Sequence, residues 1–452
     1  MGETYELVIH GGQCVTPSGI QRVDVGVREG RIVALGSIRK EQGARHIDAT
    51  GLHVLPGAID SQVHFREPGL EHKEDLATGT ASGALGGITA VFEMPNTKPN
   101  TDSFAAMADK VERTRGRVWT DISFFMGATP ENAHRLAELE NEPGCCGVKV
   151  FMGSSTGSLL IDDVGVLERA LTSGHRRIAV HCEDEARLRE RRPMLDRPDA
   201  HVGEHHKWRD AETALLATQT LIRLARKARR PVHVLHVTTA AEIAFLATCK
   251  DIATFEITPQ HLTLHAPDCY DRLGTFAQMN PPIREKHHQD ALWWAIENGV
   301  ADVLGSDHAP HTREEKARDY PKSPSGMPGV QTMLPLMLDH VNSGRLTLMR
   351  LVDLLCHGPA RLYGLTDRGR LAPGFRGDFT LVDLKAKRTI THADQASRVG
   401  WTPFDGHQVT GWPIATIING ETVMQDGALI GSPSGQPIVF PNSFSEPSLE
   451  PQ

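Results

Sequence analysis

Eight short apolar runs divide the middle of the 452-residue chain, and segments with helical periodicity lie between most of them. Strands buried on both faces read as continuous apolar runs rather than as alternating ones. Eight such strands alternating with helices over about 250 residues are typical of an α/β protein with a (β/α)8 TIM-like barrel. The runs are 53–65, 88–95, 122–128, 147–152, 177–181, 232–237, 253–257 and 300–306.

Helices are expected between these runs, most clearly over 103–115, 211–228, 240–250 and 289–297. The alternative is an open, doubly wound sheet, which also alternates strands and helices. No Gly-x-Gly-x-x-Gly follows the first run, as it would in the nucleotide-binding form of that fold. The sequence therefore favours the closed barrel.

The two ends of the chain have a different pattern of apolar and polar residues. Residues 5–9 and 31–35 alternate between apolar and polar, and 374–383 and 415–420 also resemble strands that end at Gly or Asp. We expect one small β-sandwich domain built from both chain ends. The expected division is 1–52 and 369–431 for the two parts of this domain, 53–368 for the barrel, and 432–452 for a tail.

The tail, 432–452, is rich in Pro and Ser and cannot build a core of its own. We expect an extended strap or a partly disordered segment.

Composition excludes several classes of function. The net charge of -8 and the pI near 6.3 give no basic surface for nucleic acid or for an anionic membrane. No run of about eighteen apolar residues is present, so no spanning helix is expected. The seven cysteines lack Cys-x-x-Cys spacing, and the first residues contain no basic, apolar leader. A reduced, cytoplasmic location is expected.

Polar side chains stand at the ends of most of the apolar runs. In a barrel, the carboxyl ends of the strands carry the active site, so these side chains should converge. Imidazole and carboxylate donors suit Zn²⁺, or a similar ion such as manganese or cobalt, which lowers the pKa of bound water to about 7. The residues are Gln62, His64, Arg66, Glu93, Asn96, Lys149, His181, His236, Asp307 and His308.

Residues 60–69 read Asp-Ser-Gln-Val-His-Phe-Arg-Glu-Pro-Gly. This stretch closely resembles the first-strand motif of dihydroorotases in the amidohydrolase superfamily, Asp-x-His-x-His-Phe-Arg-Glu-Pro-Gly. Gln62 stands where that family has the first histidine. Further motifs resemble the family in the right order, at 92–97, 147–157, 180–183, 235–238, 279–284 and 305–312.

The resemblance implies a metal-dependent cyclic amidohydrolase that interconverts dihydroorotate and N-carbamoyl-L-aspartate in pyrimidine biosynthesis. It implies one or two Zn²⁺ per chain and a small-molecule substrate. It also implies a homo-oligomer, either a dimer or a tetramer. Lys149 would be N6-carboxylated and bridge the metals, whereas the residue type alone also allows a salt-bridged or deprotonated amine. The implied ligands are His64, Lys149, His181, His236 and Asp307, with Asp307 also the general base and acid.

Substrate class depends on Arg66, two residues beyond His64 on the same face of the strand. A guanidinium binds a carboxylate through two parallel hydrogen bonds, and the related hydantoinases and dihydropyrimidinases lack this arginine. The alternative is a salt bridge from Arg66 to Glu67 or Asp60. The resemblance implies that Asn96, Asn280 and His311 orient the substrate with Arg66.

Two other functions stay open at this point. One is a hydantoinase or allantoinase type of cyclic amidase. The other is an inactive dihydroorotase-like subunit that supports a pathway partner, because Gln62 replaces an expected ligand. An amide oxygen is a weaker zinc donor than an imidazole, so one tightly held metal ion is expected, with any second ion weak.

Overall fold

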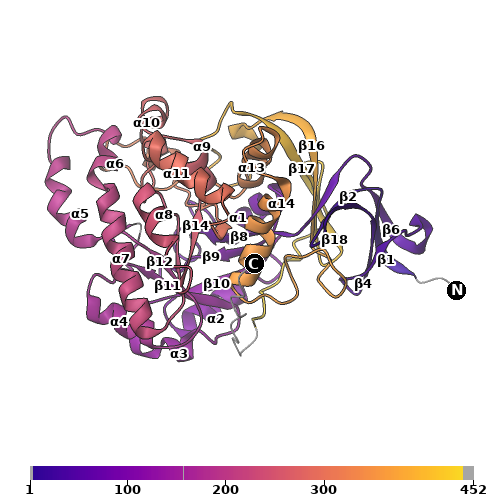
Figure 1. Cartoon of the computed structure of the whole chain (residues 1–452), viewed down its shortest axis with the longest axis horizontal. Helices are drawn as coiled ribbons and strands as arrows, with labels where there is room; N and C mark the ends of the chain where they lie inside the picture. The colour runs from indigo at the N-terminus through magenta and orange to yellow at the C-terminus, as the bar shows by residue number, and fades with distance from the viewer. Residues whose placement is uncertain (1–3, 156, 441–452) are drawn as a thin grey trace.

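The computed structural model of the chain describes residues 4–155 and 157–440. Helices surround a central set of strands, and the N-terminal strands form a separate β-rich end of the molecule (Figure 1). Among the described residues, no helix is long and apolar enough to cross a membrane.

The central sheet is a closed barrel of eight parallel strands in sequence order. Closure joins the first strand to the last, through a parallel bridge between Val63 and His308 and a 2.7 Å hydrogen bond from His64 N to His308 O. The predicted barrel is therefore confirmed, and the sheet is not open. The strands are β8 (Ala58–Val63), β9 (Ile88–Glu93), β10 (Asp121–Gly127), β11 (Cys145–Phe151), β12 (Ile178–His181), β13 (Val232–Val234), β14 (Ala253–Ile257) and β15 (Val303–Leu304).

Most of the helices cover the outside of the barrel, and local signals define their ends. Helix α7 begins after Asp210, whose side chain accepts from Thr213 N, and ends at Arg229 in the left-handed region at φ 53°. The helices are α1 (Leu76–Leu85), α2 (Phe104–Arg113), α3 (Leu136–Leu139), α4 (Val164–Thr172), α5 (Glu185–Arg191), α6 (His205–Trp208), α7 (Ala211–Ala228), α8 (Ala240–Leu246), α9 (Pro259–Thr263), α10 (Asp268–Leu273), α11 (Lys286–Glu297), α12 (Arg313–Lys316), α13 (Met333–Asn342), α14 (Leu348–Val352) and α15 (Gly358–Leu362).

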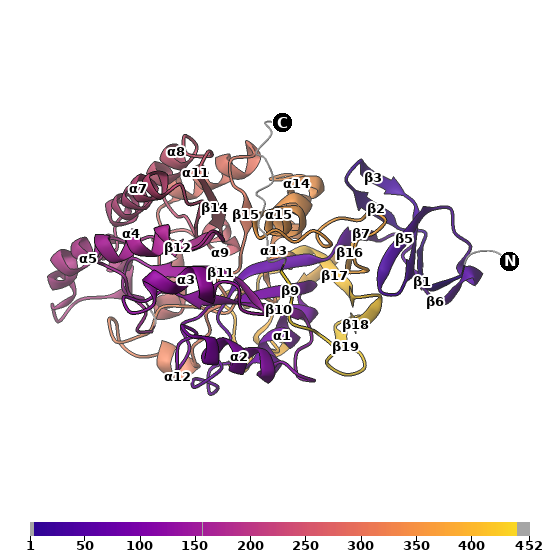
Figure 2. The same cartoon turned by 90° about the horizontal axis from the view of Figure 1, so that it is seen from below.

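The small β-sandwich is confirmed, and both chain ends build it. One sheet has the order β5-β4-β1-β6, and the other has the order β19-β18-β17-β16-β7-β2-β3. Figure 2 shows β16 and β17 between the barrel and the N-terminal strands. The strands are β1 (Tyr5–His10), β2 (Gln13–Thr16), β3 (Gly19–Arg22), β4 (Asp24–Arg28), β5 (Arg31–Gly36), β6 (Gly43–Asp48), β7 (His53–Pro56), β16 (Phe379–Thr389), β17 (Gln408–Ile418), β18 (Glu421–Gln425) and β19 (Ala428–Leu429).

The apolar run 53–65 contains two strands that belong to different sheets. Strand β7 pairs with β2 and β16 in the sandwich, and β8 begins the barrel after Gly57. A Cβ on Gly57 would lie 2.4 Å from Thr89 Oγ1, so glycine permits the close passage of the chain between the two sheets. The domain boundaries expected from the sequence stay predictions, since sheet membership places strands rather than independently folding units.

The described part of the tail forms a strap beside the start of β10. Gln436 N donates to Asp121 Oδ1 at 2.8 Å, and Ile438 N donates to Ile122 O at 2.8 Å. Ile438 and Phe440 are buried in the cluster of inward-facing barrel residues that includes Phe92. The expected strap is therefore present as far as residue 440, and 441–452 lie outside the described residues.

The strap supplies a stability prediction. Phe440→Ala removes a buried ring that stands edge-on to Phe92, with 6.1 Å between ring centroids. Urea denaturation should show a loss of about 3 kcal/mol in the free energy of unfolding, as for other buried phenylalanines. Val439→Ala is the matched control, because this neighbouring side chain is 87% exposed, and it should change little. Equal stability of the two variants would contradict a structural role for the strap.

Candidate active site

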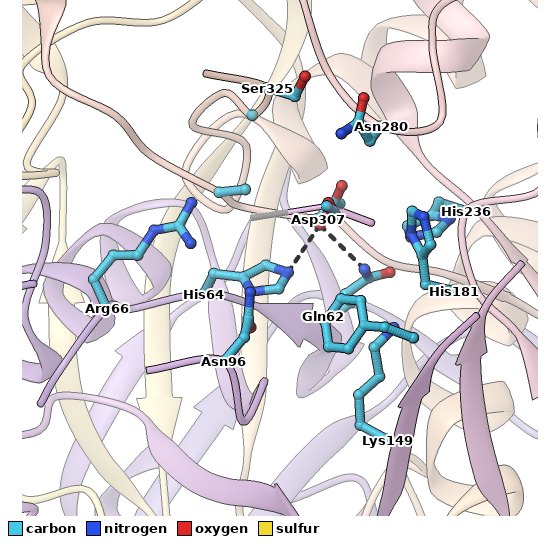
Figure 3. Close-up of a pocket in the computed structure, with 14 residues that line it drawn as sticks. Gln62, His64, Arg66, Asn96, Lys149, His181, His236, Asn280, Asp307 and Ser325 are labelled. Carbon is cyan, nitrogen blue, oxygen red and sulfur yellow. Dashed lines mark hydrogen bonds and ion pairs between the residues drawn. The ribbon is translucent and has the colours of Figure 1, made fainter. Parts of the chain in front are cut away.

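A pocket opens at the carboxyl ends of the barrel strands (Figure 3). The structure brings eight of the nine predicted site residues into its lining, from β11, β12 and the segments that follow β8, β9, β13, β14 and β15. These eight are His64, Arg66, Asn96, Lys149, His181, His236, Asn280 and Asp307. The ninth, His311, lies behind Arg66 instead.

Three residues of the lining have a left-handed backbone conformation that is rare outside glycine. The φ angles are 66° at Arg66, 36° at His236 and 44° at Asp307. Such conformations cost about 1–3 kcal/mol each and persist where the surrounding structure enforces them. Their gathering at one pocket makes it the candidate functional site.

His181 and His236 form one half of a possible metal site. His181 Nε2 donates to Glu183 Oε2 at 2.9 Å, which leaves the Nδ1 lone pair of the neutral ring facing His236 Nε2 at 3.1 Å. Burial lowers the pKa of both histidines, so neutral rings are favoured. Two nitrogen ligands of a tetrahedral zinc ion lie about 3.3 Å apart, since each Zn–N bond is about 2.0–2.1 Å. The pair therefore fits a shared metal ion.

His64 and Asp307 form the other half. His64 Nδ1 lies 2.8 Å from Asn96 Oδ1, an acceptor, so Nδ1 carries the proton of the neutral ring. The lone pair of Nε2 then faces Asp307 Oδ1 at 3.2 Å. Two acceptors at this distance need a proton or a cation between them, and burial lowers the pKa of His64. This half therefore also fits a cation.

Gln62 stands beside this second half. Its Nε2 donates to Asp307 Oδ1 at 3.1 Å. Its Oε1 is buried and has no hydrogen-bond partner among the described residues. Gln62 thus holds the carboxylate by a hydrogen bond and keeps an oxygen available as a weak donor to a metal ion.

The Lys149 amine is buried beside the two halves. Nζ has no hydrogen-bond partner in the described part of the chain and lies 4.3 Å from the centroid of the Phe151 ring. Burial lowers the pKa of Lys149 to about 7, although Asp307 acts in the opposite direction. A large share of the amine is therefore neutral near pH 7, which is the form that reacts with carbon dioxide. A salt bridge, one of the alternatives from the sequence, is not observed within the described residues.

Arg66 is a buried cation without a carboxylate partner among residues 4–155 and 157–440. Its Nε donates to Pro310 O at 3.2 Å. The acids proposed as alternative partners are engaged elsewhere: Glu67 pairs with Arg117, and Asp60 accepts from the backbone of Ser306. Burial lowers the pKa of Arg66 to about 10, so it stays charged at neutral pH. A buried, unpaired cation in a pocket favours an anionic ligand.

His311 supports Arg66 from behind. Its Nε2 lies 3.4 Å from Arg66 Nη2 and 3.1 Å from Ser325 O. Its Nδ1 lies 3.0 Å from Lys73 Nζ. Its position makes it a support for the arginine rather than a part of the pocket lining.

The sequence reasoning missed several residues at the site. Glu183 follows His181 by two positions, so the strand period could have placed both on one face. Its partner Arg209, 2.8 Å away, stands just beyond α6 and gave no periodic signal. Burial alone would raise the pKa of Glu183, but Arg209 and His181 lower it below its usual range. Glu183 and Arg209 lie outside the lining, and the residues of the lining itself that were missed are Phe151, Ser155, Ala309, Ser325 and Gly326.

The chain is similar to known proteins over most of its length. A dihydroorotase from Halobacterium salinarum is 36% identical over 91% of this chain and 96% of its own length. A dihydroorotase from Methanothermobacter thermautotrophicus is 33% identical over 90% of this chain and 92% of its own length. The solved L-hydantoinase (dihydropyrimidinase) of Arthrobacter aurescens is 28% identical, with a TM-score of 0.91 over 96% of this chain and 99% of that one.

The model of the amidohydrolase family matches residues 53–423. This match covers the whole barrel and most of the C-terminal part of the sandwich. The chain belongs to the amidohydrolase family, a metal-dependent group of hydrolases.

Proposed function

We propose that this protein is a dihydroorotase, which catalyses the reversible hydrolysis of (S)-dihydroorotate to N-carbamoyl-L-aspartate in pyrimidine biosynthesis. The observation that carries the proposal is Arg66, a buried cation that lines the pocket without a carboxylate partner among the described residues. Dihydroorotate carries a carboxylate, which can complete this ion pair through two parallel hydrogen bonds. The relatives named dihydroorotase support the same reading.

The metal is proposed to be Zn²⁺, held by His181 and His236 on one side and by His64 and Asp307 on the other. Lys149, carboxylated on Nζ, would bridge the metal ions where two are bound. Its amine has no hydrogen-bond partner in the described part of the chain, so it is available for carboxylation. When bound, zinc supplies an activated water and polarises the ring carbonyl.

Asp307 is the proposed general base and acid. Its carboxylate accepts the proton of the attacking water and returns it to the departing ring nitrogen. Gln62 donates a hydrogen bond to Oδ1 and thereby fixes the direction in which the carboxylate points. Asn96 and Asn280 line the pocket on either side of Asp307, where they can orient the ring (Figure 3).

A hydantoinase is the second candidate, and the close structural likeness to a solved L-hydantoinase favours it. Hydantoinase substrates need carry no carboxylate, so they would leave Arg66 unpaired. An inactive subunit is less well supported, because the donor atoms of both halves are present at ligand spacing. A homo-oligomer and a cytoplasmic location stay predictions.

Arg66→Met tests the substrate class. A charge-assisted hydrogen bond contributes about 1.5–3 kcal/mol, so kcat/KM for dihydroorotate should fall at least about tenfold. Arg66→Lys keeps the charge without the planar fork and should recover part of the loss. Thermal unfolding of each variant checks the fold. An unchanged kcat/KM in Arg66→Met would point to the hydantoinase instead.

Metal dependence is tested by chelation and by ligand substitution. Removal of the divalent ion should abolish turnover, and Asp307→Ala and His181→Ala should do the same while lowering the metal content of the purified protein. His134→Ala is the control, because this histidine is exposed and does not line the pocket. Full activity of the metal-free protein would contradict a metal mechanism.

Gln62 predicts how many metal ions bind tightly. One ion per chain should be held tightly, and any second ion should be removed by a mild chelator, because an amide oxygen is the weaker donor. Gln62→His should raise the affinity of the weaker site, whereas Gln62→Ala should not. Metal analysis during graded chelation measures both. Two equally tight ions in the unmodified protein would mean that another ligand compensates for Gln62.

A further inference from the structure

Glu183 and Arg209 form a buried ion pair that contacts two residues of the pocket lining, His181 and Asn280. The two side chains are 0% and 3% exposed, and Arg209 Nη2 lies 2.8 Å from Glu183 Oε2. Arg209 Nε also donates to Glu183 Oε1 at 3.0 Å, which completes a two-point contact. Removing one member of such a pair leaves an uncompensated buried charge and is strongly destabilising.

On one side, the pair contacts a proposed metal ligand. Glu183 Oε2 accepts from His181 Nε2 at 2.9 Å, which sets the tautomer and the ring orientation of His181. The same oxygen accepts from Arg209, so the position of the carboxylate depends on the guanidinium.

On the other side, the same guanidinium contacts Asn280, which is proposed to orient the substrate. Asn280 is best oriented with its amide nitrogen toward Ser325 Oγ at 3.1 Å and its oxygen accepting from Arg209 Nη1 at 3.2 Å. Arg209 Nη2 also donates to the backbone oxygen of Ser154, in the segment that follows β11. The backbone of Arg209 is itself fixed, because its carbonyl accepts from Arg284 Nη1 at 2.9 Å.

We propose that Glu183 and Arg209 are positioning residues that couple the orientation of the metal ligand His181 to that of the substrate-orienting Asn280. A guanidinium is a planar group with five donors in fixed directions, so its contact with Glu183 determines where Nη1 meets Asn280. A lysine would supply the charge but not this fixed geometry. The coupling to substrate rests on the proposed function, whereas the contact with His181 does not.

The test compares the zinc-loaded proteins with the changes Glu183→Gln and Arg209→Lys. Zinc affinity is measured by competition with a chelator, and KM and kcat are measured with dihydroorotate. Glu183→Gln should weaken zinc binding about 10–100-fold, as loss of a partner of a metal-bound histidine does, with a smaller effect on KM. Arg209→Lys should weaken zinc binding and also raise KM about tenfold. Asn280→Ala should raise KM and leave zinc affinity unchanged.

Arg230→Lys is the matched control. Arg230 and Glu140 form a pair with 2.7 Å between Nη2 and Oε2, and their side chains are 2% and 0% exposed. This pair lies at the amino ends of the barrel strands, where Arg230 Nε donates to Arg176 O. Arg230→Lys should lower stability as much as Arg209→Lys does, without changing zinc affinity or KM.

Zinc affinity equal to that of the unmodified protein in both test variants would overturn the proposal, as would an Arg209→Lys protein that differs from the control in neither zinc affinity nor KM. The chelator competition needs no substrate. If the unmodified protein failed to turn over dihydroorotate, the proposed function would be overturned, and zinc affinity alone would still decide the positioning role.

Discussion

Closure of the barrel between β8 and β15 is the constraint on which the pocket depends. Gln62 and Asp307 are 245 positions apart in sequence, and the hydrogen bond between them exists only because the first and last strands meet. Asp60 reinforces the same seam, since its Oδ1 accepts from the backbone nitrogens of both Gln62 and Ser306. The two halves of the possible metal site therefore arise from one feature of topology, with the ends of parallel strands gathered at one edge.

The pocket also concentrates polar atoms that the protein alone leaves unsatisfied. Lys149 Nζ, Gln62 Oε1 and His236 Nδ1 are buried without hydrogen-bond partners among the described residues. Each unsatisfied buried polar atom costs about 1–3 kcal/mol, so their presence at one place calls for a reason. A metal ion would give Gln62 Oε1 a partner, and carboxylation would convert the unpaired amine of Lys149. The buried polar atoms that are costly to leave unpaired are thus the same atoms that the proposed chemistry would use.

Much of the fold and of the site could be predicted because both depend on local patterns. Strands that are buried on both faces are apolar throughout, and in a barrel their polar ends must converge, which placed His181, His236 and Asp307 correctly in the pocket. The division of 53–65 between two sheets could not be predicted, because only Gly57 separates β7 from β8 and the residues on both sides of it, 54–56 and 58–59, are apolar. Sheet membership there is decided by distant partners such as β16.

Long-range contacts explain the other differences between prediction and structure. The motif that contains His311 suggested a place in the pocket, but its ring orientation depends on Lys73 and Ser325, which lie on separate segments. Arg209 was missed for the same reason, since its partner Glu183 is 26 positions away. Pairings of this kind leave no period in the sequence.

Gln62 shows how one departure from a motif can preserve part of a site. An imidazole at this position would present one lone pair to a metal ion, whereas the amide presents a donor and an acceptor on separate atoms. The donor contacts Asp307 Oδ1, so the carboxylate is oriented even where no ion lies beside it. The acceptor, Gln62 Oε1, remains available toward the pocket. Orientation of the proposed general base therefore depends on Gln62 through a hydrogen bond. In the proposed function, strong metal binding would depend on His181, His236 and Lys149.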